Sequence, residues 1–327
     1  RMPGVSRSRG RRVARVILCV AVVLSWWTPA RSAVMSPLMA GLLRRVRTCG
    51  DGLELEKKAL PMLVPGIGEL GRVLPRAASQ LSRFPDVFSV GPRSVEIIAG
   101  ATVSERSEAV GGVLNQLRGE GCVPMLQGWR NELWPVKASF DGPVELVIER
   151  AAGPLLGVRG FGCHVNGVVE GKPEKLWVGR RAATKPTYPR KLDHVVAGGL
   201  AHGEKARENV IKECAEEASI PRELAVLARS AGLVSYTQMD ESEWGLKRDL
   251  LFCYDLQLPP NFVPTASDGE VESFCLWTVP EVLDSLAADN DDWKPNVALV
   301  IIDLLVRRGY LEPDDRGYVE LVQSLRQ

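Results

Sequence analysis

The sequence lacks several features that would each define a class of protein. It has no excess of one charge, because 41 lysines and arginines against 40 acidic residues leave a formal charge of +1. It has only three histidines, and its seven cysteines are scattered, without a C-x-x-C pair. These absences argue against nucleic acid as the main partner and against a zinc site. The cysteines suit buried free thiols in a reducing compartment.

The first fifty residues lack acidic side chains altogether, although arginines recur there. An apolar run from Val13 to Trp27 is too short for a comfortable transmembrane span but has the length of a signal h-region. Ala30 and Ala33 could follow as a processing site. We therefore interpret residues 1–50 as a targeting leader or transit peptide for an organelle, in particular the chloroplast, with no membrane partner for the mature form. If translation starts at Met35, the preceding residues are a mistranslated start and the alternative is a cytoplasmic protein.

The remainder has the composition of a globular protein, with 45% hydrophobic and 25% charged residues. That length provides enough apolar material for one large domain or two ordinary ones. Residues 51–143 predict a small α+β module. In it, SVEIIAG at 94–100 alternates like a strand, and a helix with an apolar face follows a capping-box start at Ser104.

Residues 144–312 predict a second domain in which strands alternate with helices. Strand-like runs follow Glu145, and a helix is expected from about Glu204 to Ala218. Further strands and two helices, 280–287 and 296–308, close the domain. This order implies a mixed sheet covered on both faces, followed by a C-terminal tail at 313–327.

The expected helix at 204–218 carries three carboxylates on one face. Glu213, Glu216 and Glu217 stand at i, i+3 and i+4, so their side chains lie within one turn. Like charges at this spacing cost up to about half a kcal/mol per pair. A divalent cation of the Mg²⁺ type would neutralise them and take substrate phosphates as further ligands. The alternative is a solvated acidic face on a surface helix.

Two glycines, Gly198 and Gly199, end an apolar strand just before that helix. They let the backbone approach a ligand closely and could present a carbonyl oxygen to the metal. The combination suits a metal-clamped diphosphate, with one carboxylate left to orient or deprotonate the attacking water.

The spacing from Gly198 resembles the Nudix box, G-x5-E-x7-R-E-U-x-E-E-x-G-U. Glu204 matches the early acid, while Lys212 replaces the usual arginine and Ser219 replaces the usual glycine. The resemblance implies a Nudix-type α/β/α sandwich and a hydrolase that uses Mg²⁺ (or Mn²⁺). It implies as metal ligands Glu213, Glu217, Glu216 and the carbonyl of Gly198, with Glu213, Glu216 and Glu217 as the catalytic carboxylates. It also implies a structural pair of Glu204 with Lys212, which cannot be bidentate, and a further carboxylate beyond the box, for which Glu270 or Glu272 is the candidate.

The resemblance covers most of the chain, from about Phe84 to Gly309. FPDVF from Phe84, GWRNELWPV from Gly128 and RDLLFCYDL from Arg248 are similar to plant and fungal Nudix proteins. Their front module is shared with the Nudix half of fungal thiamine pyrophosphokinase fusions. This subfamily implies hydrolysis of thiamine diphosphate analogues, especially oxidised or damaged forms, to the monophosphate. The expected partner is thus a small-molecule diphosphate, with the oligomeric state left open.

A few residues outside the box are candidates for substrate binding. Arg130, Trp134 and Lys137 could form an aromatic and cationic cleft between the modules, or could simply pack there. His194 precedes the two glycines and could touch phosphate, and Arg248 is a further candidate.

Two other functions remain open from the sequence. One is a binding or regulatory module that has lost catalysis through Lys212 and Ser219. The other is a Nudix-fold diphosphate isomerase, whose separate Cys and Glu pair cannot be placed here by its motif.

Overall fold

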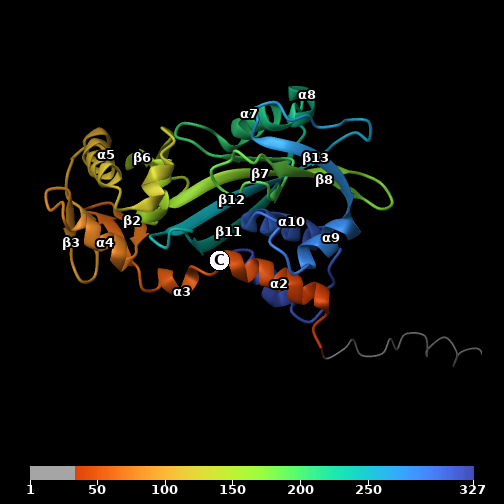
Figure 1. Ribbon diagram of the computed structural model, residues 1–327, viewed down its shortest axis with the longest axis horizontal. Coiled ribbons are helices and arrows are strands. Elements are labelled where there is room, and N and C mark those ends of the chain that lie inside the picture. The colour runs from red at the N-terminus through yellow and green to blue at the C-terminus, as the bar shows by residue number, and fades with distance from the viewer. Residues whose placement is uncertain (1–33) are drawn as a thin grey trace, which may run out of the picture.

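The computed structural model describes residues 34–327, and the expected h-region at 13–27 lies outside them. Figure 1 shows two bodies joined side by side along the long axis of the molecule. The smaller body holds residues from about 60 to 158, and the larger body holds the helix at 37–49, the long strands from residue 159 onward and the helices that cover them. Among the described residues, no helix is both long and apolar enough to cross a membrane.

The smaller body is an α+β module, as the sequence predicts. Its sheet has the order β2-β1-β4-β3, with β1 and β4 parallel. The strands are β1 (Leu60–Val64), β2 (Gly68–Val73), β3 (Phe88–Val90) and β4 (Val95–Ile97), and the helices α4 (Pro75–Leu81) and α5 (Val103–Glu120) accompany them. The short helix α3 (Leu53–Glu56) precedes β1 and contacts the strand at Arg229–Met239 in the larger body. Thr102 caps α5, and Thr102 with Glu105 completes the capping box. The expected start at Ser104 was therefore two residues late.

The core of this module extends further along the chain than residue 143. The antiparallel pair β5 (Leu133–Val136) and β6 (Leu146–Glu149) packs on it, as does the short helix α6 (Gly153–Leu156). Leu146, Ile148 and Val158 are buried in the same apolar cluster as the strands of the first sheet. The end of the first packed unit therefore lies near residue 158.

The larger body is built on a mixed seven-stranded sheet. Its main path is β11-β12-β7-β8-β13, while β10 pairs with β7 and β9 pairs with β8. Strand β12 is parallel to β7, and every other pairing is antiparallel. The strands are β7 (Arg159–Val169), β8 (Lys175–Arg181), β9 (Leu192–Asp193), β10 (Val196–Gly199), β11 (Arg229–Met239), β12 (Leu246–Gln257) and β13 (Val271–Thr278).

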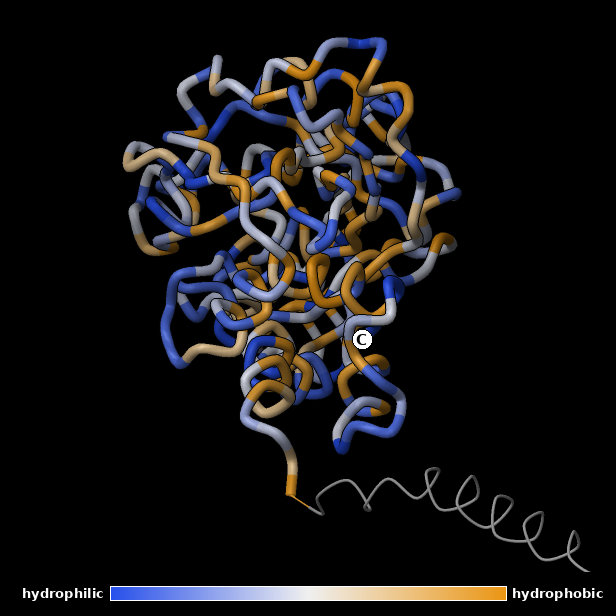
Figure 2. Tube along the Cα trace, turned by 90° about the vertical axis from the view of Figure 1, so that its right-hand side faces the viewer, coloured by the Kyte–Doolittle hydropathy of each residue, from blue (hydrophilic) through white to orange (hydrophobic). Residues whose placement is uncertain are grey.

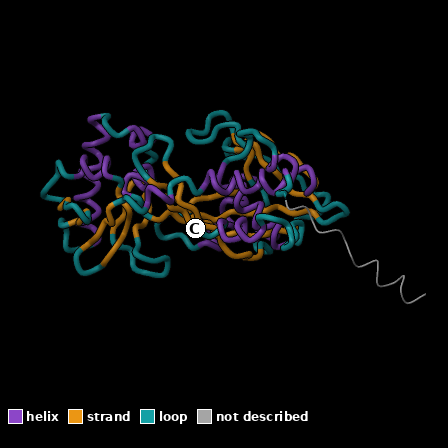
Figure 3. Tube along the Cα trace, turned by 90° about the horizontal axis from the view of Figure 1, so that it is seen from below, coloured by secondary structure: helices purple, strands orange, loops and turns teal. Residues whose placement is uncertain are grey.

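Helices cover both faces of this sheet (Figures 1 and 3). One face carries α7 (Ala206–Ala218) and α8 (Arg222–Ala225), and the other carries α2 (Pro37–Cys49), α9 (Val279–Ala287), α10 (Pro295–Arg307) and α11 (Tyr318–Ser324). Strand β7 alternates between them, because Cys163 and Val165 belong to the α7 cluster and Val168 to the α10 cluster. Figure 2 shows apolar positions interleaved with polar ones along the chain. The predicted α/β/α sandwich is confirmed.

Helix α2 corrects the expected extent of the leader. Residues 37–49 belong to the folded body, and Met39, Leu42 and Val46 are fully buried beside α9 and α10. The basic character of this segment has a structural use, since Arg45 donates hydrogen bonds to the carbonyls of Leu286 (3.0 Å) and Ala288 (3.1 Å) at the end of α9. A leader boundary at residue 50 therefore includes a core helix.

The C-terminal segment is also packed. Leu321 of α11 and Leu325 are fully buried, and the carbonyl of Leu325 accepts a hydrogen bond of 3.0 Å from the N–H of Ser235 in β11. The segment expected as a tail, residues 313–327, thus closes the α2 face of the sheet.

Candidate active site

The glycines at the end of β10 lie directly against the acidic helix. A β-carbon at Gly198 would stand 2.6 Å from Oε1 of Glu213, closer than any real contact of that kind. Neighbouring Gly199 lies against Arg150, whose guanidinium nitrogens would stand 3.2 Å from a β-carbon there. Because these two residues have no side chains, the β10 backbone, the Glu213 carboxylate and the Arg150 guanidinium can lie in one small space.

Glu213 and Glu217 are held where their negative charge is unfavourable. Burial raises the pKa of Glu217 to about 8, although its Oε2 accepts a hydrogen bond of 2.8 Å from the N–H of Ala197. Burial also raises the pKa of Glu213, against the influence of Lys212. Glu216 is exposed and lines the same cavity. A bound cation would stabilise the ionised form of two desolvated carboxylates that face the same space.

The two positions that depart from the Nudix pattern keep the local structure. Lys212 pairs with Glu204 at 2.7 Å, as expected, and also approaches Glu213 at 3.4 Å. Burial opposes ionisation of Glu204, but the hydrogen bond from Lys212 outweighs it and lowers the pKa of Glu204. Ser219 takes the left-handed conformation, with φ of 51°, that glycine usually supplies at a helix end. Its hydroxyl donates to the carbonyl of Thr265 at 2.9 Å, and the helix ends normally.

Asn209 is a site residue that spacing alone did not reveal. Its buried Nδ2 lies within hydrogen-bond distance of the carbonyl of Gly199 (3.1 Å), Oε2 of Glu204 (3.0 Å) and Oε1 of Glu213 (3.2 Å). One amide therefore ties the end of β10 to the acidic side chains of the box. The sequence shows only that an asparagine lies on an apolar helix face, and this pattern does not indicate which groups the amide binds.

We expect Asn209→Ala to loosen this assembly. The unfolding free energy should fall by about 1–3 kcal/mol, because buried acceptors lose their donor. Mg²⁺ affinity should fall roughly 10–100-fold, as when the support of a metal ligand is removed. Thermal unfolding and Mg²⁺ titration measure the two effects. Asn115→Ala, at an exposed position of α5, is the matched control; equal Mg²⁺ affinity in both variants would contradict this role for Asn209.

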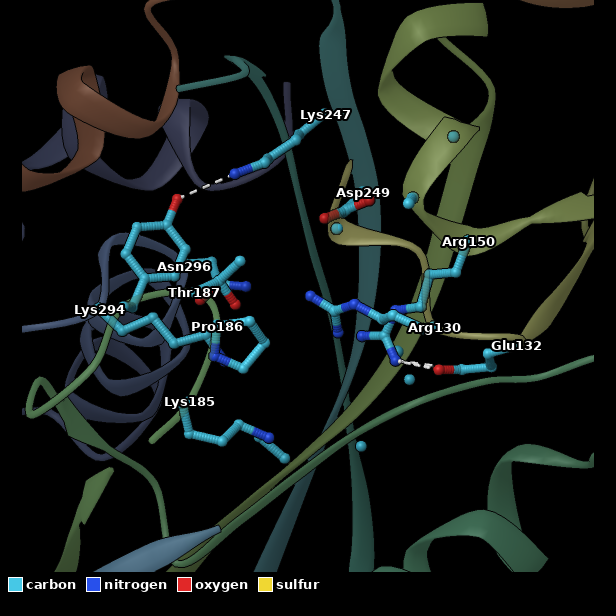
Figure 4. Close-up of a pocket in the computed structure, with 18 of the residues that line it drawn as sticks. Arg130, Glu132, Arg150, Lys185, Pro186, Thr187, Lys247, Asp249, Lys294 and Asn296 are labelled. Atoms are coloured by element: carbon cyan, nitrogen blue, oxygen red, sulfur yellow. Dashed lines mark hydrogen bonds and ion pairs between the residues drawn. The ribbon is translucent and has the colours of Figure 1, made fainter. Parts of the chain in front are cut away.

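The carboxylates open onto a cavity of about 1200 Å³ that both bodies line. Gly198, Glu213, Glu216 and Glu217 form one part of the wall, and Glu270 lies on a loop at the same cavity. Arg130 and Trp134 come from the smaller body, and Arg248 also lines the cavity. Figure 4 shows Arg130 and Arg150 reaching toward Lys185, Pro186 and Thr187 on the opposite side.

The structure places three of the candidates elsewhere. Lys137 and Glu272 are outside the cavity wall, and Lys137 donates to the carbonyl of Phe140 at 3.1 Å. His194 is fully enclosed behind the wall, edge-on to His164 at 5.0 Å between ring centroids. Burial lowers the pKa of His194 to about 4, so this histidine is neutral at physiological pH. Glu270 is paired with Lys185 at 2.5 Å.

A buried charge cluster stands behind the wall. Asp193 pairs with Arg181 at 2.9 Å and with Lys294 at 3.3 Å, and both cations reach the cavity. Burial opposes ionisation of Asp193, but Lys294 and the neighbouring cations outweigh it and hold its pKa well below the usual range. The cluster joins β8 and β9 to the start of α10, which lies 101 residues further along the chain than Asp193.

The oxygen ligands at this site suit Mg²⁺ or Mn²⁺ better than zinc. Within residues 34–327, no three His, Cys, Asp or Glu side chains converge as a ready-made metal cage. Zinc sites normally have three or four such ligands. Mg²⁺ instead keeps several waters and is held by one or two carboxylates together with substrate phosphates. Glu213, Glu217 and the carbonyl of Gly198 fit that requirement.

None of the described residues that line the cavity is a cysteine. Cys163 and Cys214, which are near the box, are buried in the apolar cluster under α7. The wall therefore offers no thiol for the alkene chemistry of the isomerase alternative.

Comparison with known proteins matches two family models in succession. Residues 41–160 match a domain of unknown function, DUF4743, and residues 161–297 match the NUDIX domain. The chain is 40% identical over 307 residues to "Nudix hydrolase 20, chloroplastic" of Arabidopsis thaliana, which covers 90% of this chain and 80% of that protein. It is 42% identical over 292 residues to "Nudix hydrolase 24, chloroplastic" of the same plant, covering 88% and 78%. An uncharacterised protein of Saccharomyces cerevisiae is 34% identical over 220 residues, or 63% of each chain.

Proposed function

This chain belongs to the Nudix hydrolases, enzymes that act on diphosphates, and we propose that it converts thiamine diphosphate analogues, in oxidised or damaged forms, to the monophosphate. The proposal rests on one observation above all: two desolvated carboxylates, Glu213 packed against Gly198 and Glu217 bound to the N–H of Ala197, lie together at the wall of a large cavity. The thiamine-like body follows from the resemblance of the front module.

We assign Mg²⁺, or Mn²⁺, to Glu213, Glu217 and the carbonyl of Gly198, in keeping with the divalent metals that Nudix hydrolases generally use. When bound, the cation supplies charge neutralisation for the phosphate oxygens and polarises the anhydride. Glu216 and Glu270 are assigned as an additional ligand or water-positioning group. In the reaction a water oxygen forms a bond to phosphorus, the bridging P–O bond breaks, and a box carboxylate takes the proton that the water releases.

We also propose that the protein acts in the chloroplast. Two lines support this: the acid-free, arginine-rich composition of residues 1–33, and the names of two relatives, which describe them as chloroplastic.

A panel of diphosphates tests the activity. With Mg²⁺, we expect the purified protein to release inorganic phosphate from oxidised thiamine diphosphates, and chelation of the metal to stop the release. Mass analysis of the products separates the alternatives, because an isomerase gives a product of equal mass and a binding module gives none. Either of those two outcomes rejects the hydrolase assignment.

A further inference from the structure

The loop that joins β12 to β13 is bound to the C-terminal end of α7 (Figure 1). The N–H of Thr265 donates to the carbonyl of Ala218 at 3.1 Å, and the hydroxyl of Ser267 donates to the carbonyl of Glu216 at 2.5 Å. The last four carbonyls of a helix have no partner within the helix. The loop supplies donors to two of them, so the helix that carries the box carboxylates also sets the position of the loop.

Ser219 adds a hydrogen bond that the usual glycine of the Nudix box could not make. Its hydroxyl donates to the carbonyl of Thr265 at 2.9 Å, so Thr265 is held at both its N–H and its carbonyl. The serine has φ of 51°, in the left-handed region that is unfavourable for a residue with a side chain. Glycine would suit the helix end alone better, so the hydroxyl is what the serine contributes here.

The same loop carries Glu270 to the cavity. The N–H of Glu270 donates to Oδ1 of Asp268 at 2.8 Å, and its carbonyl accepts from the N–H of Ala182, just after β8, at 2.9 Å. The carboxylate pairs with Lys185 at 2.5 Å and faces the same cavity as Glu217. Burial, and then nearby carboxylates including that of Glu270, raise the pKa of Glu217 to about 8. The two carboxylates are therefore close enough to interact electrostatically.

We propose that Ser219 is a positioning residue, whose hydroxyl holds the β12–β13 loop against α7 so that Glu270 stays beside the box carboxylates. The inference rests on the proposed hydrolysis, in which Glu270 is an additional ligand or water-positioning group, and adds the residue that fixes its place. Ser219 lies outside the cavity wall, so it acts through the loop and not by contact with substrate. The departure from the Nudix pattern at this position thus supports catalysis instead of weakening it.

Ser219→Gly tests the proposal, because it restores the glycine of the box and removes the hydroxyl. We expect its thermal midpoint to stay within about 3 °C of the wild type, since relief of the left-handed conformation offsets the lost hydrogen bond. Amide exchange over residues 263–270 of the metal-free protein should become about fivefold faster. With Mg²⁺, kcat should fall about tenfold and KM should change by less than about threefold, because only the support of Glu270 is lost.

Further variants assign the effect to Glu270. In a Glu270→Gln background, Ser219→Gly should lower kcat by less than about twofold, whereas independent effects would multiply. Ser267→Ala removes the other hydroxyl bond to α7 and should speed the same amide exchange and lower kcat roughly three- to tenfold. Two matched controls should change neither value: Glu243→Gly, at φ of 61° and outside the cavity wall, and Ser82→Ala, whose exposed hydroxyl donates to a carbonyl of α4 at 2.9 Å.

Wild-type kcat in folded Ser219→Gly, or a tenfold loss that persists in the Glu270→Gln background, would overturn the proposal. Unchanged amide exchange would overturn it as well. If Ser219→Gly does not fold, as judged by its thermal unfolding, Ser267→Ala decides by the same two measurements.

The exchange measurement needs no turnover, so the two proposals can fail separately. Hydrolysis by the wild type together with unchanged exchange and kcat in Ser219→Gly refutes the positioning role and leaves the hydrolase intact. Faster exchange in Ser219→Gly without phosphate release by the wild type upholds the attachment of the loop and refutes the hydrolase.

Discussion

Glu217→Gln should abolish turnover while leaving the protein folded. We expect kcat to fall on the order of 10³-fold or more, because the variant removes both a metal ligand and a negative charge beside the reacting phosphate. Steady-state phosphate release with Mg²⁺ measures the loss. Glu208→Gln, on an exposed part of the same helix and outside the cavity wall, is the matched control and should retain turnover.

The stability of this variant separates a lost ligand from a damaged fold. Because burial raises the pKa of Glu217 to about 8 from an ordinary 4.5, the unfolded chain releases this proton at lower pH than the folded protein. The metal-free protein should therefore lose stability as pH rises between those values. Glutamine carries no such proton, so Glu217→Gln should lose less stability over the same range. Turnover near the wild-type level in a folded variant would contradict the assignment of Glu217.

Gly198→Ala should have the second largest effect. A β-carbon at this position would stand 2.6 Å from Oε1 of Glu213, so the carboxylate or the end of β10 must move. We expect kcat/KM to fall by about 100-fold, since a displacement of roughly 1 Å in a catalytic group costs that much. The unfolding free energy should also fall by about 1–3 kcal/mol from overpacking.

Gly111→Ala is the control for that substitution. Gly111 lies within α5, and a β-carbon there would meet no atom within 4 Å. Alanine should stabilise the helix by up to about 1 kcal/mol and leave kcat/KM unchanged. If Gly198→Ala is as active as Gly111→Ala, the close packing of β10 against Glu213 has no part in catalysis.

The periodicity of the sequence was enough to predict the acidic helix and a mixed sheet covered on both faces, and the resemblance to the Nudix family implied the α/β/α sandwich. Glu213, Glu216 and Glu217 share a face because of local spacing, and local spacing is what a sequence displays. The strands around β7 were visible for the same reason, since their apolar residues alternate between two helical layers.

Composition gave wrong predictions where a basic residue can serve either targeting or substrate binding, or the packing of the fold. The arginines before Asp51 look like a leader, yet Arg45 caps the end of α9 from a helix buried in the core. Lys137 was expected in an aromatic and cationic cleft with Arg130 and Trp134, but it lies outside the cavity. Only the packing of segments far apart in the chain shows which of these roles a given basic residue has.

The residues that the sequence did not reveal are those whose partners are distant. Asn209 is defined by its hydrogen bond to the end of β10, and Asp193 by its ion pair with Lys294, 101 residues further along the chain. Single-residue patterns carry no information about these contacts.

Calorimetric titration with Mg²⁺ tests the central claim most directly. We expect the wild-type protein to bind Mg²⁺, and Glu213→Gln and Glu217→Gln each to weaken that binding strongly while Glu208→Gln does not. Equal binding by all four proteins, or none by the wild type in the presence of a diphosphate, would contradict the assignment of the α7 carboxylates as the metal site.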